Sequence, residues 1–409
     1  MRNYIVCIAS EYKGNEFLEE AQNAGWHVSL VTRKKLLDEP WAWTAVNEVK
    51  TVEDEALPVD YVRAATNLAG SHPIHRIVGL DEFDVITAAL TREHLQVDGM
   101  NSSFVRRFRD KLTMRNIAST AGIPCPEFVG AFDRDGINRF LETASSPWIV
   151  KPRNEVSAFG IRKCETAQEV WDVLTDLDSR NTWRDHPSQF LVERFIKGRV
   201  FHVDSVVYNG RVAAAGVSQY GTAPLDVSHH GGVFTSYTVN YRSRERRTLE
   251  QLNKQLLAAF GLEQGVTHAE FLQSEADGEF YLLEVACRVG GAYIANVHEQ
   301  ASNFNLWREW AKLETSSPER PYKAPKIRKE YAGIALALAK VDEPDTTHYE
   351  DPEIVYRVKK AKHVGLIFCS QKHQRLQELL HSYTERITND FLEVAPAKER
   401  HDDSAFLGG

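Results

Sequence analysis

Two glutamates of this chain are expected to face each other on a β-hairpin. The segment VTHAEFLQSEADGEFYLLEVACRV contains two apolar runs separated by turn residues. A three-residue loop from Ala276 to Gly278, with the glycine left-handed, pairs Glu270 with Glu284 at a Cβ separation of about 5 Å. A two-residue turn at Asp277-Gly278 would shift this register. Two carboxylates so close favour a divalent cation between them, and the alternative is a pair of exposed glutamates on a solvated face.

Arg288 adds a positive charge to the same predicted face. It follows Glu284 by four residues, and side chains on a strand alternate between the two faces, so both lie on the side that carries Glu270 and His268. Two oxygen ligands for Mg²⁺ with a guanidinium beyond them suit the binding of nucleotide phosphates. The simpler interpretation is an exposed ion pair between the arginine and the glutamates.

Two lysines and one further glutamate are candidates for binding a nucleotide. Lys151 ends the apolar strand PWIVK, and the loop after it contains small residues whose backbone N–H groups can approach an anion. Lys111 lies on a predicted helix over residues 104–122, where a lysine more often faces solvent. In LVERFI, Glu193 could accept a hydrogen bond from an adenine amino or ribose group, or it could simply end a partly exposed strand.

Composition narrows the class of protein. The chain has 409 residues, enough for two or three domains, and 43% of them are hydrophobic. Its net charge of −8 argues against a nucleic-acid partner. The five cysteines are scattered, without a C-x-x-C, so neither a disulfide framework nor a zinc site is indicated. The sequence shows no signal peptide or membrane-spanning run, and we expect a cytoplasmic protein in a reducing compartment.

The order of apolar runs and helical patterns predicts three regions. Residues 1–100 alternate strand and helix, as in YIVCIA, NEFLEEAQNAG and HVSLVT, and predict a small open α/β domain similar to the Rossmann type. Residues 101–317 follow the polar segment DGMNSS and include a smaller subdomain at about 126–196. Residues 318–409 predict an α+β lobe with a disordered tail. The overall fold class is therefore α/β and α+β.

Five short motifs, in one order, resemble a known superfamily. RDKLTMR, WIVKPR with its small-residue loop, VERFIKG, HAEFL and LLEVACRVGG resemble the ATP-grasp superfamily, most closely its carboxylate–amine ligase branch, which includes the L-amino-acid (dipeptide) ligases. The resemblance covers residues 100 to 312, and the flanking regions agree in layout. It implies an ATP-grasp core between a preceding α/β domain and a following lobe.

The resemblance also implies roles for individual residues. The metal ligands would be Glu270 and Glu284, with Mg²⁺, or alternatively Mn²⁺, as the ion. Arg288 would stabilise an acyl phosphate and the tetrahedral intermediate after it, and Gly290 and Gly291 would leave room for that intermediate. The residues that contact ATP would be Lys111, Lys151, Ser157, Gly160, Glu193, Arg194, Phe195, Ile196 and His202.

One loop and one substitution complete these expectations. The polar loop TAPLDVSHHGGV places His230 where it could bind the acyl phosphate or a substrate, although a surface histidine pair is the simpler interpretation. The family usually has asparagine two residues after the second glutamate, and this chain has Ala286. The loop after Lys151 also has fewer glycines than usual. These departures leave the metal count open.

The activity implied by the resemblance is the ATP-dependent joining of two small amino or carboxylic acids. An acyl phosphate would form first, an amine would attack it, and ADP and phosphate would be released. A bicarbonate-using carboxylase or purine-pathway type of ligase, and an ATP-binding module without catalysis, are the alternatives. Related enzymes are often dimers. The sequence does not identify the acid and the amine that are joined, the biological pathway or the oligomeric state.

Overall fold

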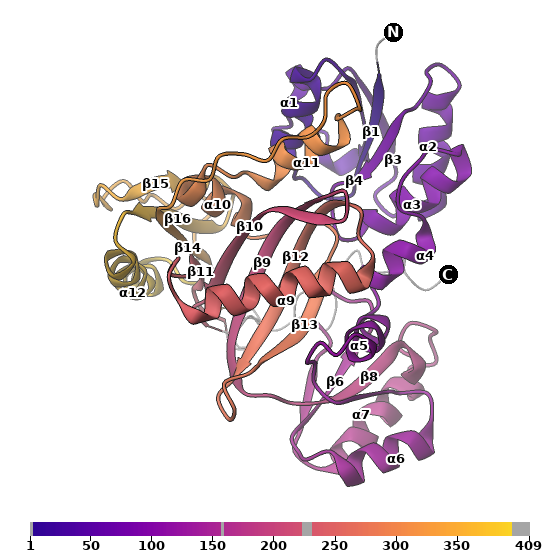
Figure 1. Cartoon of the computed structure of the whole chain (residues 1–409), viewed down its shortest axis with the longest axis vertical. Helices are drawn as coiled ribbons and strands as arrows, with labels where there is room; N and C mark the ends of the chain where they lie inside the picture. Colours follow the sequence, from indigo (N-terminus) through magenta and orange to yellow (C-terminus); the bar gives the residue numbers. More distant parts are fainter. Residues whose placement is uncertain (1–2, 157–158, 223–230, 395–409) are drawn as a thin grey trace.

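The computed structural model describes residues 3–156, 159–222 and 231–394. Figure 1 shows an N-terminal α/β domain, a central sheet crossed by a long helix, and a smaller subdomain beside it. The described residues form one parallel four-stranded sheet, one antiparallel eight-stranded sheet and one antiparallel four-stranded sheet. None of the described helices is long and apolar enough to cross a membrane.

The N-terminal domain has a parallel sheet with the order β3-β2-β1-β4. The predicted βαβ units form because each short apolar run is buried between helices, and β1 is fully buried from Ile5 to Ala9. One strand and one helix of this domain, β3 and α2, were not predicted from the sequence. The elements are β1 (Tyr4–Ala9), α1 (Asn15–Asn23), β2 (His27–Arg33), β3 (Glu48–Val52), α2 (Pro58–Ala69), β4 (Arg76–Gly79) and α3 (Asp84–Leu95).

The helix predicted over residues 104–122 is broken, so that prediction is wrong in its first half. A short helix, α4 (Ser102–Val105), is followed by a 3₁₀ turn, and α5 (Lys111–Thr120) then begins afresh. The break occurs because the Asp110 carboxylate accepts a hydrogen bond from the Leu112 N–H and so caps the new helix. Lys111 is therefore the first residue of a helix rather than a residue in the middle of one.

The smaller subdomain packs two helices on a sheet with the order β5-β8-β6-β7. Its apolar core includes Trp148 and Val150 of β6 and Leu174 of α7. Lys151 ends this buried stretch of β6, as the sequence predicts. The elements are β5 (Phe128–Gly130), α6 (Arg134–Thr143), β6 (Trp148–Pro152), β7 (Arg162–Cys164), α7 (Ala167–Ser179) and β8 (Phe190–Arg194).

The central sheet has the order β13-β12-β9-β10-β11-β14-β16-β15, so strands of the C-terminal region extend it. A tight turn at Asn209-Gly210 connects the antiparallel strands β9 and β10, and both turn residues have positive φ. The strands are β9 (Gly198–Tyr208), β10 (Arg211–Tyr220), β11 (Phe234–Thr238), β12 (Gln264–Ser274), β13 (Phe280–Ala286), β14 (Tyr331–Leu338), β15 (Ile354–Arg357) and β16 (His363–Ser370). The helices are α9 (Arg244–Phe260), α10 (Ile294–Ser302), α11 (Leu306–Glu314) and α12 (His373–Asp390).

The β12–β13 hairpin pairs Glu270 with Glu284, as predicted, although its loop is longer than predicted. The Ser274 N–H donates to the Glu279 carbonyl, so four residues and not three form the loop. A bulge between Leu282 and Glu284 offsets the extra residue and restores the predicted register at the end near the site. Gly278 has φ +74°, the left-handed conformation that the turn requires.

Candidate active site

A cavity of about 440 Å³ lies between the smaller subdomain and the central sheet. One part of its wall is apolar and includes Ile149 of β6 and Leu272 of β12, whereas another part is charged. An apolar slot with a charged end suits a planar base attached to phosphates. Among the residues that line it are eight of the predicted site residues: Lys111, Lys151, Glu193, Arg194, Phe195, Ile196, Glu270 and Glu284.

Lys151 is buried at the end of β6 and is held by Glu193 from the adjacent strand β8. One carboxylate oxygen of Glu193 forms an ion pair with Lys151. The other oxygen lies 3.0 Å from Nε of Arg115, which is on α5. Burial lowers the pKa of Lys151 to about 8, and Glu193 only partly opposes this effect. Both oxygens of Glu193 are thus engaged, so in this structure it positions the lysine rather than offering a free acceptor to a ligand.

Lys111 joins the hairpin to the segment that follows β6. Its Nζ lies 3.0 Å from a carboxylate oxygen of Glu284 and donates to the Glu155 carbonyl at 2.7 Å. Burial alone would raise the pKa of Glu284, but Lys111, Lys151 and Arg288 outweigh it and lower that pKa to about 2. Glu284 is consequently ionised and surrounded by cations.

Glu270 has a different set of partners. The Tyr220 hydroxyl donates to one Glu270 oxygen at 2.7 Å, and His268 Nε2 lies 3.4 Å from the same atom. The other ring nitrogen of His268 lies 2.8 Å from a carboxylate oxygen of Asp204. Burial alone would lower the pKa of His268, but Asp204 and Glu270 raise it to about 9. His268 therefore links Glu270 to the buried carboxylate of Asp204.

Asp204 is fully buried and contacts three histidines. His202 and His298 lie 2.6 and 2.9 Å from one of its oxygens, and His268 lies beside the other. Two glycines leave space for these rings: a Cβ on Gly216 would lie 2.2 Å from His298, and one on Gly290 would lie 2.8 Å from His268. Gly290 is thus required by the packing of His268, a reason that differs from the room for an intermediate inferred from sequence.

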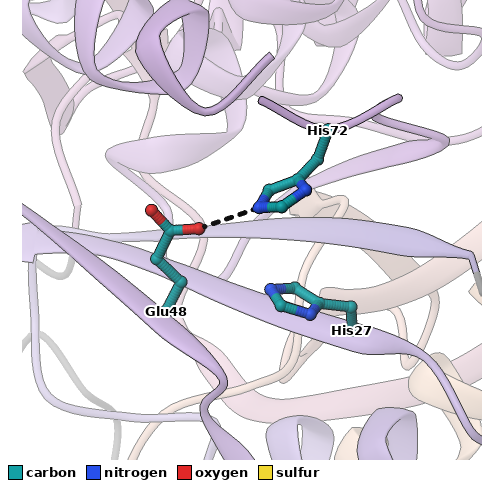
Figure 2. A group of neighbouring side chains, drawn as sticks. All are labelled: His27, Glu48 and His72. Carbon is teal, nitrogen blue, oxygen red and sulfur yellow. Dashed lines mark ion pairs between the residues drawn. The ribbon is translucent and has the colours of Figure 1, made fainter. Parts of the chain in front are cut away.

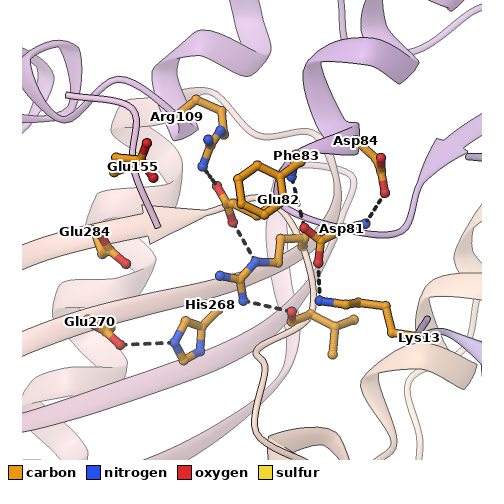
Figure 3. A network of polar contacts seen from close by, with 12 residues as sticks. Lys13, Asp81, Glu82, Phe83, Asp84, Arg109, Glu155, His268, Glu270 and Glu284 are labelled. Carbon is orange, nitrogen blue, oxygen red and sulfur yellow. Dashed lines mark hydrogen bonds and ion pairs between the residues drawn. The ribbon is translucent and has the colours of Figure 1, made fainter. Parts of the chain in front are cut away.

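Arg288 lies at the junction with the N-terminal domain and is held by Glu82. Glu82 follows β4 and also pairs with Arg109, and Figure 3 shows Arg109 pointing at it, with Asp81 and Lys13 beside it. Burial alone would raise the pKa of Glu82, but the two arginines hold it below the usual value. The N-terminal domain therefore fixes the direction of the Arg288 guanidinium.

The remaining predicted residues are placed less directly. His202 has no exposed surface, and its second ring nitrogen lies 2.7 Å from the Ser236 hydroxyl, so it cannot contact a nucleotide directly in this structure. A Cβ on Gly291 would meet no atom within 4 Å, which agrees with open space next to Arg288. Gly160 has φ +70° in the loop after Lys151. Ser157 and His230 lie outside the described residues.

The donors at the hairpin fit the metal ion that the sequence implies. Glu270 and Glu284 are paired on adjacent strands and both line the cavity, so their carboxylate oxygens can reach one ion. Mg²⁺ prefers such hard oxygen ligands and retains several waters. Ala286 lies opposite His268, two pairs further along the same ladder, and contributes no ligand.

Three residues that organise the site were missed from sequence. Arg115 and Glu193 are 78 residues apart, and Glu82 and Arg288 are 206 apart, so no local spacing links them. Asp204 lies in the apolar run VFHVDSVV, two residues after His202, which is one of its hydrogen-bond partners. A charged residue inside an otherwise apolar strand was the available signal, because it indicates a buried polar network.

Comparison with known proteins gives a consistent result. Residues 144–296 match the ATP-grasp domain family. An L-arginine-specific L-amino acid ligase of Bacillus subtilis is 23% identical over 235 residues, which cover 58% of this chain and 56% of that protein. A D-alanine–D-alanine ligase of Saccharophagus degradans is 29% identical over 189 residues, covering 43% and 54%. The chain therefore spans about half the length of the curated relatives it matches.

A solved structure matches nearly the whole chain. The crystal structure of an L-amino acid ligase from Bacillus licheniformis superimposes with a TM-score of 0.74, covering 96% of this chain and 99% of that one. The two sequences are 17% identical over this match, so the likeness establishes the fold. It includes the N-terminal domain and the C-terminal strands as well as the central region.

Proposed function

The chain carries an ATP-grasp domain within an ATP-grasp fold, as its sequence predicts, and we propose that it is an ATP-dependent carboxylate–amine ligase. One observation carries the proposal: the paired carboxylates Glu270 and Glu284 line the same cavity as Lys111 and Lys151. Arg288 lies two residues beyond the end of β13, where Glu82 of the N-terminal domain holds it. This arrangement provides separate places for a base, for phosphates and for a reacting carboxylate.

In the proposed complex, ATP occupies the 440 Å³ cavity. The adenine lies against the apolar wall, with the backbone of Arg194 to Ile196 along its edge, and the phosphates point toward Lys111 and Lys151. Lys151 is kept in place by Glu193 and Arg115, so little side-chain entropy is lost when it binds an anion. Lys111 would turn from Glu284 toward a phosphate.

Glu270 and Glu284 would hold Mg²⁺, or Mn²⁺ in its place. The metal would supply positive charge beside the transferred phosphoryl group. Tyr220 and His268 fix the direction of the Glu270 carboxylate before any ligand arrives. The low pKa of Glu284 keeps it ionised at neutral pH.

The reaction proceeds in two steps in this proposal. An oxygen of the substrate carboxylate attacks the γ-phosphorus, the bond to the β-phosphate oxygen breaks, and ADP leaves. An amine then attacks the carbonyl carbon, loses a proton, and displaces phosphate. Negative charge develops on oxygen in both steps, and Arg288 is suited to stabilise it because its guanidinium stays protonated and can contact two oxygens.

The substrates that we propose are small amino acids, in agreement with the names of the two ligases that match in sequence. Near Arg288 the site contains negative as well as positive charge, because Asp81 and Glu82 lie close to the guanidinium. Both signs of charge suit a substrate that carries an amino group and a carboxylate group. Nucleic acid and membrane are not proposed as partners. A cytoplasmic location and a homodimer remain predictions.

The proposal is tested by measuring phosphate release from ATP while amino acids are supplied singly, in pairs and with bicarbonate. Release that requires a particular pair, together with a dipeptide product in mass spectra, supports a carboxylate–amine ligase. Release with bicarbonate alone favours a carboxylase. ATP binding without phosphate release under any condition would leave only a nucleotide-binding module and would overturn the proposal.

A further inference from the structure

A second group of metal-ligating side chains lies away from the active site. His27 begins β2, Glu48 begins β3, and His72 lies in the loop between α2 and β4, so all three are at the amino ends of parallel strands. Figure 2 shows the three side chains facing one another. Asp81 and Glu82 follow β4 and therefore lie at the opposite, carboxyl ends of these strands, where Glu82 contacts Arg288 of the candidate active site. The proposed ligase reaction uses none of the three.

The spacing of the three side chains matches a tetrahedral ion. One ligand atom from each lies within 4.8 Å of the others, and His72 Nε2 is 3.3 Å from a Glu48 oxygen. Bonds of about 2.1 Å at tetrahedral angles separate ligand atoms by about 3.4 Å. The His27 and His72 ring centroids are 5.2 Å apart, and two imidazoles bound to one ion place theirs about 5 Å apart.

The surroundings hold these side chains in place. The Tyr4 ring, at the start of β1, lies 4.7 Å from the His27 ring and 4.7 Å from the His72 ring, and it is stacked on the latter. The second oxygen of Glu48 is 3.2 Å from Lys50 Nζ, which leaves the first oxygen directed at His72. All three candidate ligands are half-buried.

We propose that His27, Glu48 and His72 bind a divalent ion of the Zn²⁺ type, with water in the fourth position. Two imidazoles and one carboxylate suit Zn²⁺ better than Mg²⁺, which prefers oxygen ligands alone. The ion would join β3, the edge strand of the sheet, to β2 and to the loop before β4. From the cysteine spacing the sequence indicated no zinc site, but the ligands proposed here are two histidines and a glutamate from three separate segments, so cysteine spacing could not reveal them.

A different buried group is a weaker candidate. His202, Asp204 and His268 also lie close enough to share an ion. Their polar atoms are already used, since Asp204 contacts three histidines and both ring nitrogens of His202 have partners. A metal there would have to displace these hydrogen bonds in a place with almost no solvent access. The half-buried group at the edge of the N-terminal sheet has no such barrier.

The test is Zn²⁺ binding to the full-length protein in a millimolar excess of Mg²⁺, which saturates the proposed phosphate-side metal site. Bound zinc is measured by equilibrium dialysis and elemental analysis, and Co²⁺ absorption reports the coordination. The variants are His72→Ala and Glu48→Gln. His94→Ala is the matched control, because His94 is an exposed histidine on α3 of the same domain.

We expect the wild-type chain and the control to bind one Zn²⁺ and to show the visible absorption of tetrahedral Co²⁺. Each ligand variant should lose at least about tenfold in affinity. Zn²⁺ should also raise the melting temperature of the wild type but not of either variant. Absence of Zn²⁺ binding to the wild type, or unchanged binding to both variants, would overturn the site. Neither result would bear on the ligase activity.

Discussion

Glu270 and Glu284 are opposite each other on one hairpin, yet their surroundings differ in kind. Glu284 is surrounded by three cations, of which Lys151 and Arg288 are held by other carboxylates. The third, Lys111, lies 3.0 Å away and is the one proposed to turn toward a phosphate. Glu270 is held by Tyr220 and by His268, which is fixed in turn by a fully buried aspartate. The first arrangement can rearrange when phosphates arrive, whereas the second is set before binding. One carboxylate is thus adjustable and the other is preorganised.

The largest effect is expected from Glu284→Gln, which removes the charge on the adjustable side. We expect turnover to fall about a thousandfold, because a proposed metal ligand is lost and Lys111 loses its anionic partner. Steady-state phosphate release measures this. Glu279→Gln is the matched control, because Glu279 is an exposed glutamate next to the loop of the same hairpin. Wild-type turnover in Glu284→Gln would disprove the metal assignment.

A substitution on the preorganised side should act on metal affinity. Asp204→Asn weakens the hold on His268 and therefore on Glu270, and we expect Mn²⁺ affinity to fall about 10- to 100-fold, as for other outer partners of metal ligands. Titration of Mn²⁺ by electron paramagnetic resonance in the presence of ATP measures it without turnover.

Asp204 is a buried charge, so the variant could also be less stable. His298→Asn serves as the second variant, since it removes only the contact from α10 at 2.9 Å and leaves the aspartate in place. It should lower Mn²⁺ affinity less than Asp204→Asn does. If a folded Asp204→Asn protein bound Mn²⁺ as tightly as the wild type, the aspartate would not position Glu270.

The pairing of the two glutamates could be predicted from the sequence, whereas most of the residues that surround them could not. The pairing of Glu270 with Glu284 followed from turn residues and strand alternation, and it held although the loop was one residue longer, because the bulge before Glu284 compensated. Lys151 was found because it ends an apolar run. Asp204 and Glu82 were not predicted, since His268 lies 64 residues from Asp204 and Arg288 lies 206 residues from Glu82, and only the folded chain brings these partners together.

The secondary-structure elements also divide into those that local sequence patterns predict and those that they do not. Most of the parallel sheet at the N-terminus was predictable because β1, β2 and β4 are short apolar runs, whereas the polar edge strand β3 was not predicted. The break before α5 was not recognised, because a cap at Asp110 is a weak signal inside a pattern that otherwise favours a helix. That β14, β16 and β15 would extend the central sheet could not be predicted, since strand order depends on long-range pairing.

The pH dependence of turnover should report the charge of Lys151, near the adjustable carboxylate. Lys151 has a pKa of about 8, so the free enzyme loses this positive charge as pH rises through 8. We expect kcat/KM for ATP to be constant below that pH and to fall about tenfold per unit above it. In Lys151→Arg the charge persists, and the fall should move to higher pH. The same profile in both proteins would assign it to another group.

The smallest effect on turnover is expected at the far end of the preorganised side. The Ser236 hydroxyl lies 2.7 Å from His202, which is three contacts removed from Glu270 through Asp204 and His268. Ser236→Ala leaves a buried ring nitrogen without its partner, which costs about 1 to 3 kcal/mol of unfolding free energy. Turnover should change less than about threefold, because His268 and Tyr220 still hold Glu270.

Ser218 provides the matched control for that change. It is fully buried on β10, directly across from His202, and within the described residues its hydroxyl has no hydrogen-bond partner. Ser218→Ala should therefore leave the free energy of unfolding unchanged or raise it, since no hydrogen bond is lost. Urea titrations of both variants measure the change in the free energy of unfolding that each substitution causes. A loss of turnover in Ser236→Ala as large as in Asp204→Asn would mean that the histidines act as one rigid unit, and the order of effects along this side of the site would then be wrong.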